Sequence, residues 1–250
     1  MYKIIYFIIV VWVFSTGCTK DSGVSNGTGN NGGTDIGTGG SLARFTITND
    51  HLFTVDNEKL KSYNLADPTQ PKFVAESEVG FGIETIFAGK DNILFLGSTT
   101  GMYIYDVTEP MYPGRISNYQ HIYSCDPVVA NDKFAFVTLS TTSRCGRDVN
   151  ELQIVDISNL EQPFMVRSYK MDNPKGLGIS NNNLFVCDGG LKVYDATNVG
   201  SLKLLHKFGI PAIDIIPMDT LLMVIADDGL HQYKYKDGDV TLLSKLLINK

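Results

Sequence analysis

Three aspartates recur at one place in a repeated motif and are the first candidates for metal binding or catalysis. Asp106, Asp156 and Asp195 each end a short apolar run and stand two residues before Thr or Ser. An Asp in that position accepts hydrogen bonds from backbone N–H groups and starts a turn. We therefore interpret these aspartates as structural. The same interpretation covers Asp188 and Asp227-Asp228, which precede glycine-containing turns.

Two cysteines lie close to an insertion between two predicted strands. The insertion covers residues 140–150 and contains Cys145, whereas Cys125 ends the connection before the first of these strands. We expect both cysteines on one face of the fold, where an oxidising compartment would permit a disulfide. Two free thiols, or a metal site completed by His121, are the alternatives.

The same region holds a candidate binding loop. Aromatic and arginine side chains in an exposed loop are the residue types enriched at binding sites. The residues concerned are Tyr119, His121, Tyr123, Arg144 and Arg147. Because Tyr also stacks on sugar rings, protein and glycan partners both remain open. A variable loop clipped for protease resistance is the alternative.

Searches for catalytic motifs find little. The sequence has no Gly-x-Ser-x-Gly, His-Glu-x-x-His or Cys-x-x-Cys, and no phosphate-binding glycine loop before a helix. Cys187 falls within an apolar run and is expected to be a small buried side chain rather than a nucleophile. We expect no cofactor and no enzyme activity.

The elements that position these residues come from an internal repeat. A short motif returns five times, beginning at Leu60, Met102, Leu152, Leu191 and Leu230, with steps of 42, 50, 39 and 39 residues. Four of the copies follow a second apolar run by seven or eight residues, and the copy at Leu152 follows its run, which starts at Phe134, by 18. Repeats of about 40 residues built from short strands and polar turns indicate a β-propeller.

Four strands can be drawn in each repeat, giving an all-β, five-bladed propeller of four-stranded antiparallel blades. The predicted strands are 42–48, 51–55, 60–65 and 72–79; 83–88, 93–97, 102–107 and 115–120; 127–130, 134–139, 152–157 and 164–170; 177–180, 184–187, 191–196 and 203–208; and 213–217, 221–226, 230–236 and 241–248. Ring closure is expected to press the fifth blade on the first.

The starts of the innermost strands should surround one mouth of the central channel. The residues there form a candidate ring of Arg44, Glu84, Asp126, Lys175 and Asp214. Such a ring can hold a small polar ligand or a hard cation, which prefers oxygen ligands. It can equally neutralise itself through salt bridges, the interpretation that we favour.

The N-terminal sequence indicates export from the cytoplasm. Lys3, the apolar run 4–14 and the small residues 15–17 resemble a signal peptide over residues 1–17, and Ser15-Thr-Gly-Cys18 resembles the lipobox of bacterial lipoproteins. The resemblance implies a lipid on Cys18, with residues 18–41 as a flexible Gly/Asn/Thr/Ser-rich tether and residues 42–250 as the propeller. A Sec signal with a chance cysteine is the alternative. With 27 acidic against 21 basic residues, binding to nucleic acid is not expected.

The third strand and its turn carry a family resemblance. Leu152-Gln-Ile-Val-Asp-Ile-Ser-Asn-Leu-Glu-Gln-Pro163 resembles the LVIVD repeat, and the segments from Leu60 and Met102 repeat the same ending. The chain thus resembles LVIVD-repeat β-propeller lipoproteins of Bacteroidetes-like bacteria. That resemblance implies a propeller without a shared catalytic activity.

From these observations we predict a lipid-anchored, extracytoplasmic lipoprotein of the outer membrane, on its periplasmic or its surface side. Its propeller would act as a monomeric, non-enzymatic binding or scaffold module, adhesion-like, for an unknown protein or glycan. One alternative is a carbohydrate-active enzyme with Glu84, Asp126 and Asp214 as its acids. A purely structural envelope protein is the other.

Overall fold

The fold is seen in a computed structural model of the chain. The structure describes residues 40–121, 127–140, 149–236 and 239–248. The chain divides into two units, residues 1–33 and 34–250, and every described residue belongs to the second. The predicted signal peptide, Cys18 and nearly all of the tether therefore lie outside the described residues.

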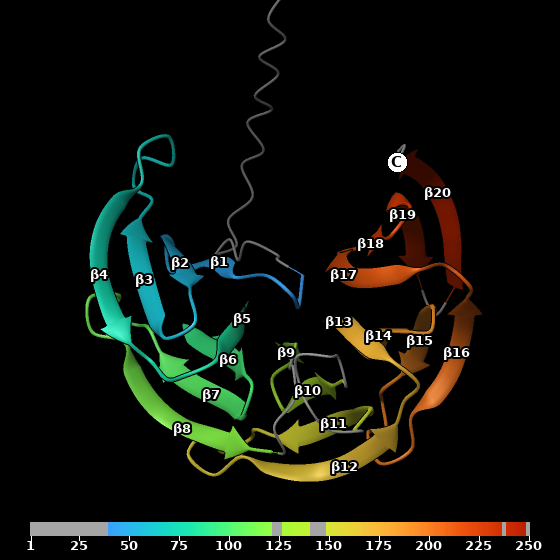
Figure 1. The fold of residues 1–250 in the computed structure, drawn as a ribbon, viewed down its shortest axis with the longest axis horizontal. Coiled ribbons are helices and arrows are strands. Elements are labelled where there is room, and N and C mark those ends of the chain that lie inside the picture. The colour runs from blue at the N-terminus through green and yellow to red at the C-terminus, as the bar shows by residue number, and fades with distance from the viewer. Residues whose placement is uncertain (1–39, 122–126, 141–148, 237–238, 249–250) are drawn as a thin grey trace, which may run out of the picture. The chain divides into compact units, whose positions relative to one another are not determined.

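Within these described ranges, twenty strands form five four-stranded sheets, each a simple antiparallel meander (Figure 1). Blade one holds β1 (Phe45–Thr48), β2 (His51–Val55), β3 (Lys59–Asn64) and β4 (Lys72–Glu78). Blade two holds β5 (Ile83–Ala88), β6 (Ile93–Ser98), β7 (Gly101–Asp106) and β8 (Gly114–Gln120). Blade three holds β9 (Val128–Ala130), β10 (Phe134–Leu139), β11 (Glu151–Asp156) and β12 (Phe164–Lys170). Blade four holds β13 (Pro174–Ser180), β14 (Asn183–Asp188), β15 (Leu191–Asp195) and β16 (Lys203–Phe208). Blade five holds β17 (Ala212–Met218), β18 (Leu221–Ala226), β19 (Gly229–Lys236) and β20 (Asp239–Leu247).

The predicted all-β propeller of five four-stranded blades is confirmed. Every predicted strand is present, and several, such as β5 and β10, have the predicted bounds. The largest differences are three residues, at β1, which begins at Phe45 rather than Leu42, and at β13, which begins at Pro174 rather than Leu177. A register shift after Pro174 interrupts the pairing with β14, so the apolar pattern alone marked only the regular part of the strand.

Asn and Asp residues close the first hairpin of several blades. Asn49 and Asp50 both have positive φ, as do Asp91 and Asn92 in blade two. Two successive residues with positive φ match the twist of antiparallel strands, and Asn and Asp tolerate that conformation better than other non-glycine residues. The turns therefore place an Asn/Asp-rich edge where the innermost strands end.

An irregularity recurs at one position in every blade. The pairing of the third and fourth strands shifts register between Ser62 and Tyr63 in blade one, and at the equivalent positions of the other four blades. A bulge increases the local twist of a strand pair. The blades thus share the bend of their outer strands as well as their hydrophobic pattern.

The core lies between blades rather than within one. We call the side of a blade that packs on the next blade in the chain its trailing face, and the opposite side its leading face. In the first interface, Phe53 and Leu60 of blade one pack with Leu94 of blade two. The equivalent residue of Phe53 is again Phe in blades two, three and four, and all four rings are fully buried. Three further clusters repeat the arrangement between the following blades.

The innermost strands β1, β5, β9, β13 and β17 contact one another in chain order around a central axis. Among the described residues, no hydrophobic cluster joins blade five to blade one. Figure 1 shows the two sheets apart on the side where the ring would close. The predicted packing of blade five on blade one is therefore wrong for the described residues. We call this break in the ring the open seam.

Candidate functional site

A cavity of about 810 Å³ opens where the innermost strands end, a place that we call the distal mouth. Its walls are side chains from the innermost strands, including Ile86, Val129, Leu177 and Ile215. Its rim is polar and comes from the hairpin turns that follow β5, β9 and β13. An apolar hollow with a few polar groups at its edge is the usual form of a ligand site.

The charges on this rim are unequal. Its charged residues are Lys90, Asp132 and Lys133. Lys90 forms an ion pair with Asp132, which links the turns of blades two and three. The ammonium of Lys133 lies 5.4 Å from the centre of the Phe134 ring. Two cations against one carboxylate leave the rim with one net positive charge.

Amide side chains complete the rim and are held by the turns. Asn131 Oδ1 accepts hydrogen bonds from the backbone N–H groups of Lys133 at 3.0 Å and Phe134 at 2.8 Å. Its side-chain oxygen is therefore engaged in shaping the turn. Asn181 and Asn182, in the turn after β13, also line the cavity. Amides both donate and accept, so they can bind hydroxyl groups as well as anions.

The opposite opening, the proximal mouth, is crossed by the segment that leads into β1. The hydroxyl of Ser41 donates to Asp214 Oδ1 at 2.9 Å, and the N–H of Leu42 donates to Asp214 Oδ2 at 3.2 Å. Ser41 Oγ in turn accepts a hydrogen bond from the N–H of Leu177 at 2.8 Å. The start of blade one is thereby tied to the innermost strands of blades four and five.

The segment that crosses the proximal mouth is packed closely against Asp214. A Cβ on Gly40 would lie 2.1 Å from Asp214 Oδ2, and one on Gly176 would lie 2.2 Å from Asp214 Oδ1. Only glycine fits at either position. Burial raises the pKa of Asp214, and hydrogen bonds from Ile215, Ser41 and Leu42 partly offset that effect.

The predicted ring at the proximal mouth divides into several environments. Arg44 is exposed, Glu84 and Lys175 are partly buried, and Asp214 is buried. Asp126 lies outside the described residues. Both carboxylate oxygens of Asp214 accept hydrogen bonds from the protein. A small second hollow of about 290 Å³ is lined by Lys175 and by Asp227. The binding role of this ring stays a prediction.

The predicted binding loop is described only at its start. Its other members lie outside the described residues, namely Tyr123, Arg144 and Arg147. The predicted disulfide between Cys125 and Cys145 lies outside them too and stays a prediction. The rings of Tyr119 and His121 lie 6.1 Å apart. The hydroxyl of Tyr119 donates to Gln153 Oε1 at 2.9 Å, which connects blade two to blade three.

The structural interpretation of the recurring aspartates is confirmed. Asp106, Asp156 and Asp195 each accept a hydrogen bond from the backbone N–H two residues further on, at 2.7, 2.8 and 2.9 Å. The backbone and side-chain hydrogen bonds from Ser158 hold the pKa of Asp156 below its ordinary value. Asp188 is also structural, because its Oδ1 accepts from the N–H groups of Asp172 and Asn173 and its Oδ2 pairs with Lys192 at 2.6 Å.

Cys187 is buried against the apolar core between blades four and five, as predicted. Burial strongly raises the pKa of its thiol, and the nearby Asp214 carboxylate acts in the same direction. A thiol that resists ionisation is a poor nucleophile. Cys187 therefore belongs to the core and not to a reactive site.

The distal mouth is the feature that sequence reasoning missed. The signal was present as Asn/Asp doublets at 49–50, 91–92, 131–132 and 181–182, once in each of the first four repeats. Taken singly, each doublet predicts only a turn between two strands. Their recurrence places polar groups around one opening of the channel, because equivalent turns of successive blades lie on the same side of a propeller.

The fold and this channel define a repeat β-propeller protein. Residues 146–171 match the LVIVD repeat family, which places the match on β11, β12 and the turn between them. No curated protein matches the sequence. Among the described residues, no helix is long and apolar enough to cross a bilayer.

Solved structures agree on the fold. A protein from Lactobacillus plantarum is similar with a TM-score of 0.64 at 14% identity, over 78% of this chain and 67% of the other. A functionally unknown protein from Desulfotomaculum acetoxidans gives 0.63 at 15% identity, over 87% and 73%. Kluyveromyces lactis Hsv2p gives 0.51 at 13% identity, over 76% and 58%. At these identities the likeness shows the fold alone.

Proposed function

We propose that this protein is a lipid-anchored, extracytoplasmic binding module whose propeller presents the distal mouth to a partner at the cell envelope. The single observation that supports the proposal most is the cavity of about 810 Å³ with its polar rim. A rigid ring of blades that positions variable turns is the division of labour found in many binding folds. The anchoring itself rests on the N-terminal sequence and on Cys18.

The chemistry of the rim favours a polar or weakly anionic group as the bound part of the partner. Lys133 contributes a positive charge beside the Lys90–Asp132 pair. Asn181 and Asn182 contribute amides that pair with hydroxyl groups. A sugar residue with a carboxylate or another acidic substituent would satisfy both features. We therefore propose an acidic glycan of the envelope as the ligand class.

The carbohydrate-active enzyme receives no support from the geometry of Asp214. A general acid or nucleophile needs an oxygen that faces the substrate. Both oxygens of Asp214 accept hydrogen bonds from the segment that crosses the proximal mouth. We accordingly propose binding rather than glycoside hydrolysis. A purely structural role in the envelope is the alternative that the binding test below distinguishes.

The test is a binding screen of residues 34–250 on immobilised acidic and neutral glycans. The variant combines Lys133→Ala with Asn181→Ala, and the matched control combines Lys170→Ala with Asn118→Ala, two residues of outer strands. Retention on acidic glycans that falls about tenfold in the cavity variant and not in the control supports the proposal. Equal retention by both, or no retention by the wild type, contradicts it.

A second variant, Tyr123→Ala with Arg144→Ala and Arg147→Ala, examines the predicted binding loop. Loss of retention in this variant alone would place recognition on the predicted binding loop. In that case the distal mouth would not be the binding site.

A further inference from the structure

The first four blades each bury a phenylalanine at the same position of the trailing face, whereas blade five does not. Four equivalent positions on the trailing faces of blades one to four are occupied by Phe53, Phe95, Phe136 and Phe185, which are 0–2% exposed. The third strand of each of these blades adds one further buried apolar residue, such as Leu152 in blade three. In blade five the equivalents are Met223 and Leu230, and both are only partly buried.

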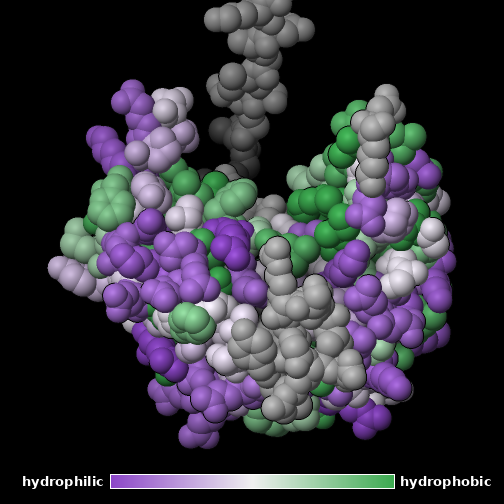
Figure 2. Space-filling model, viewed as in Figure 1, coloured by the Kyte–Doolittle hydropathy of each residue, from purple (hydrophilic) through white to green (hydrophobic). Residues whose placement is uncertain are grey.

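The trailing face of blade five is nevertheless apolar. Ile225 is 41% exposed and Met218 is 44% exposed. Leu221, which pairs with Met218 across β17 and β18, is partly buried. Figure 2 shows hydrophobic surface on this sheet, at the upper right, on the side that looks across the open seam. The middle strand β18 thus carries apolar residues on two faces although only one face is covered.

The leading face of blade one is the other wall of the seam. Phe45 in β1 is 57% exposed, whereas its equivalent in blade two, Ile86, is 2% exposed in the first interface. Leu52 is partly buried, whereas its equivalent Leu94 is completely buried. In the other four blades, the leading face packs against the preceding blade. The leading face of blade one has the equivalent apolar residues but no preceding blade to pack against.

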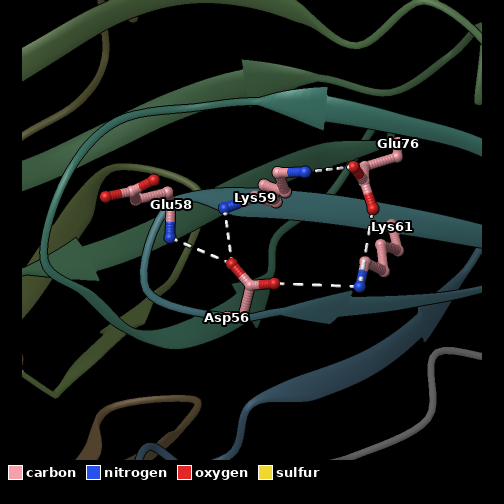
Figure 3. Close-up of polar contacts among 5 residues, drawn as sticks. All are labelled: Asp56, Glu58, Lys59, Lys61 and Glu76. Atoms are coloured by element: carbon pink, nitrogen blue, oxygen red, sulfur yellow. Dashed lines mark hydrogen bonds and ion pairs between the residues drawn. The ribbon is translucent and has the colours of Figure 1, made fainter.

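The outer part of this wall is charged but neutral overall (Figure 3). Lys61 lies 3.8 Å from Asp56 and 3.5 Å from Glu76, and Lys59 also pairs with Glu76. Asp56 Oδ1 accepts the N–H groups of Glu58 at 3.0 Å and Lys59 at 2.8 Å. Two lysines balance two carboxylates, so the network carries no net charge that would repel a neighbour. A polar rim around an apolar centre is the usual composition of a protein interface.

We propose that the open seam is a self-association surface, in which the trailing face of blade five in one copy packs on the leading face of blade one in a second copy. A second copy is the occupant because each chain carries both halves of the contact. The same kind of contact is already made four times within the chain. The sequence predicts a monomer with a closed ring. A ring that is open between blades five and one leaves two interblade faces for a second copy, so we propose self-association in place of the monomer.

The contact is heterologous, because the two surfaces that meet are different. One junction leaves a free blade-five face on one copy and a free blade-one face on the other. Self-association should therefore depend on both faces, with each face acting in a different copy. The proposal does not rest on the ligand proposed for the distal mouth.

The test uses the full chain in mild detergent, co-expressed with two different tags, and measures co-purification through one tag. The face variants are Ile225→Glu for blade five and Phe45→Glu for blade one. The matched control is Phe164→Glu, an equally exposed aromatic on the outer strand β12. Circular dichroism and unfolding midpoints show whether each variant is folded.

Wild-type and control copies are expected to co-purify. Two copies of either face variant should co-purify about tenfold less. One Ile225→Glu copy with one Phe45→Glu copy should recover the association, because the first retains blade one and the second retains blade five. A wild type that does not co-purify would overturn the proposal, and so would failure of the mixed pair to recover.

Discussion

At the scale of single residues, Asp214 links parts of the fold that are far apart in the sequence. Its two oxygens join the segment before β1 to the far side of the channel, and glycine is required at two neighbouring positions. The sequence predicted Asp214 at one mouth of the channel, within a ring expected to form salt bridges, but it did not indicate Ser41 as its partner. Ser41 is separated from it by 173 residues, and no local pattern encodes a contact of that range.

Asp214→Asn is expected to lower the free energy of unfolding by about 1–3 kcal/mol. An amide can accept the Ser41 hydroxyl, but its NH2 group would then face the N–H donor of Leu42. Denaturant unfolding of wild type and variant at one pH measures the difference. Asp219→Asn, in an exposed turn, is the control and should be neutral.

The pH dependence of that difference has a definite sign. Burial raises the pKa of Asp214, so the folded state holds the proton more tightly than the unfolded state. The stabilisation is complete below the ordinary Asp pKa and is lost as the pH rises through the raised value. The stability difference between wild type and Asp214→Asn should thus narrow as the pH rises through this range. A difference that widens would mean that the pKa is lowered instead.

At the scale of elements, the repeat predicted nearly everything. The period of about 40 residues, the paired apolar runs and the Asx turns gave twenty strands in the correct order. The bulge between the third and fourth strands was not predicted, because a bulge does not change the apolar pattern of the blade. The distal mouth was missed for a related reason, since its groups come from turns that look like ordinary connections.

A matched pair of substitutions examines the interblade rule. Phe136→Ala removes a ring that is 0% exposed between blades three and four, and it should cost about 3–5 kcal/mol. Met223→Ala changes the equivalent position of blade five, which is only partly buried, and should cost about 1 kcal/mol. Denaturant unfolding of the two variants gives the comparison. Equal losses would mean that the trailing face of blade five is covered as fully as the others.

At the scale of the whole molecule, ring closure was the expectation that failed for the described residues. That expectation follows from the propeller architecture, in which each blade packs between two neighbours. The local pattern of β18, apolar on two faces, is the same whether its second face meets a neighbour in the chain or another molecule. The sequence therefore predicts that this face is apolar, but it cannot name what covers it.

The proposed function requires that the propeller bind its partner at the distal mouth. Hydrogen–deuterium exchange of residues 34–250, with and without an acidic envelope glycan fraction, can locate that contact. We predict slower exchange in the rim turns, at residues 88–90, 130–134 and 179–182, and no change in the outer strands β4, β8, β12 and β16. Slower exchange confined to peptides around residues 119–126 and 140–150, or no change anywhere, would show that the distal mouth does not bind the glycan.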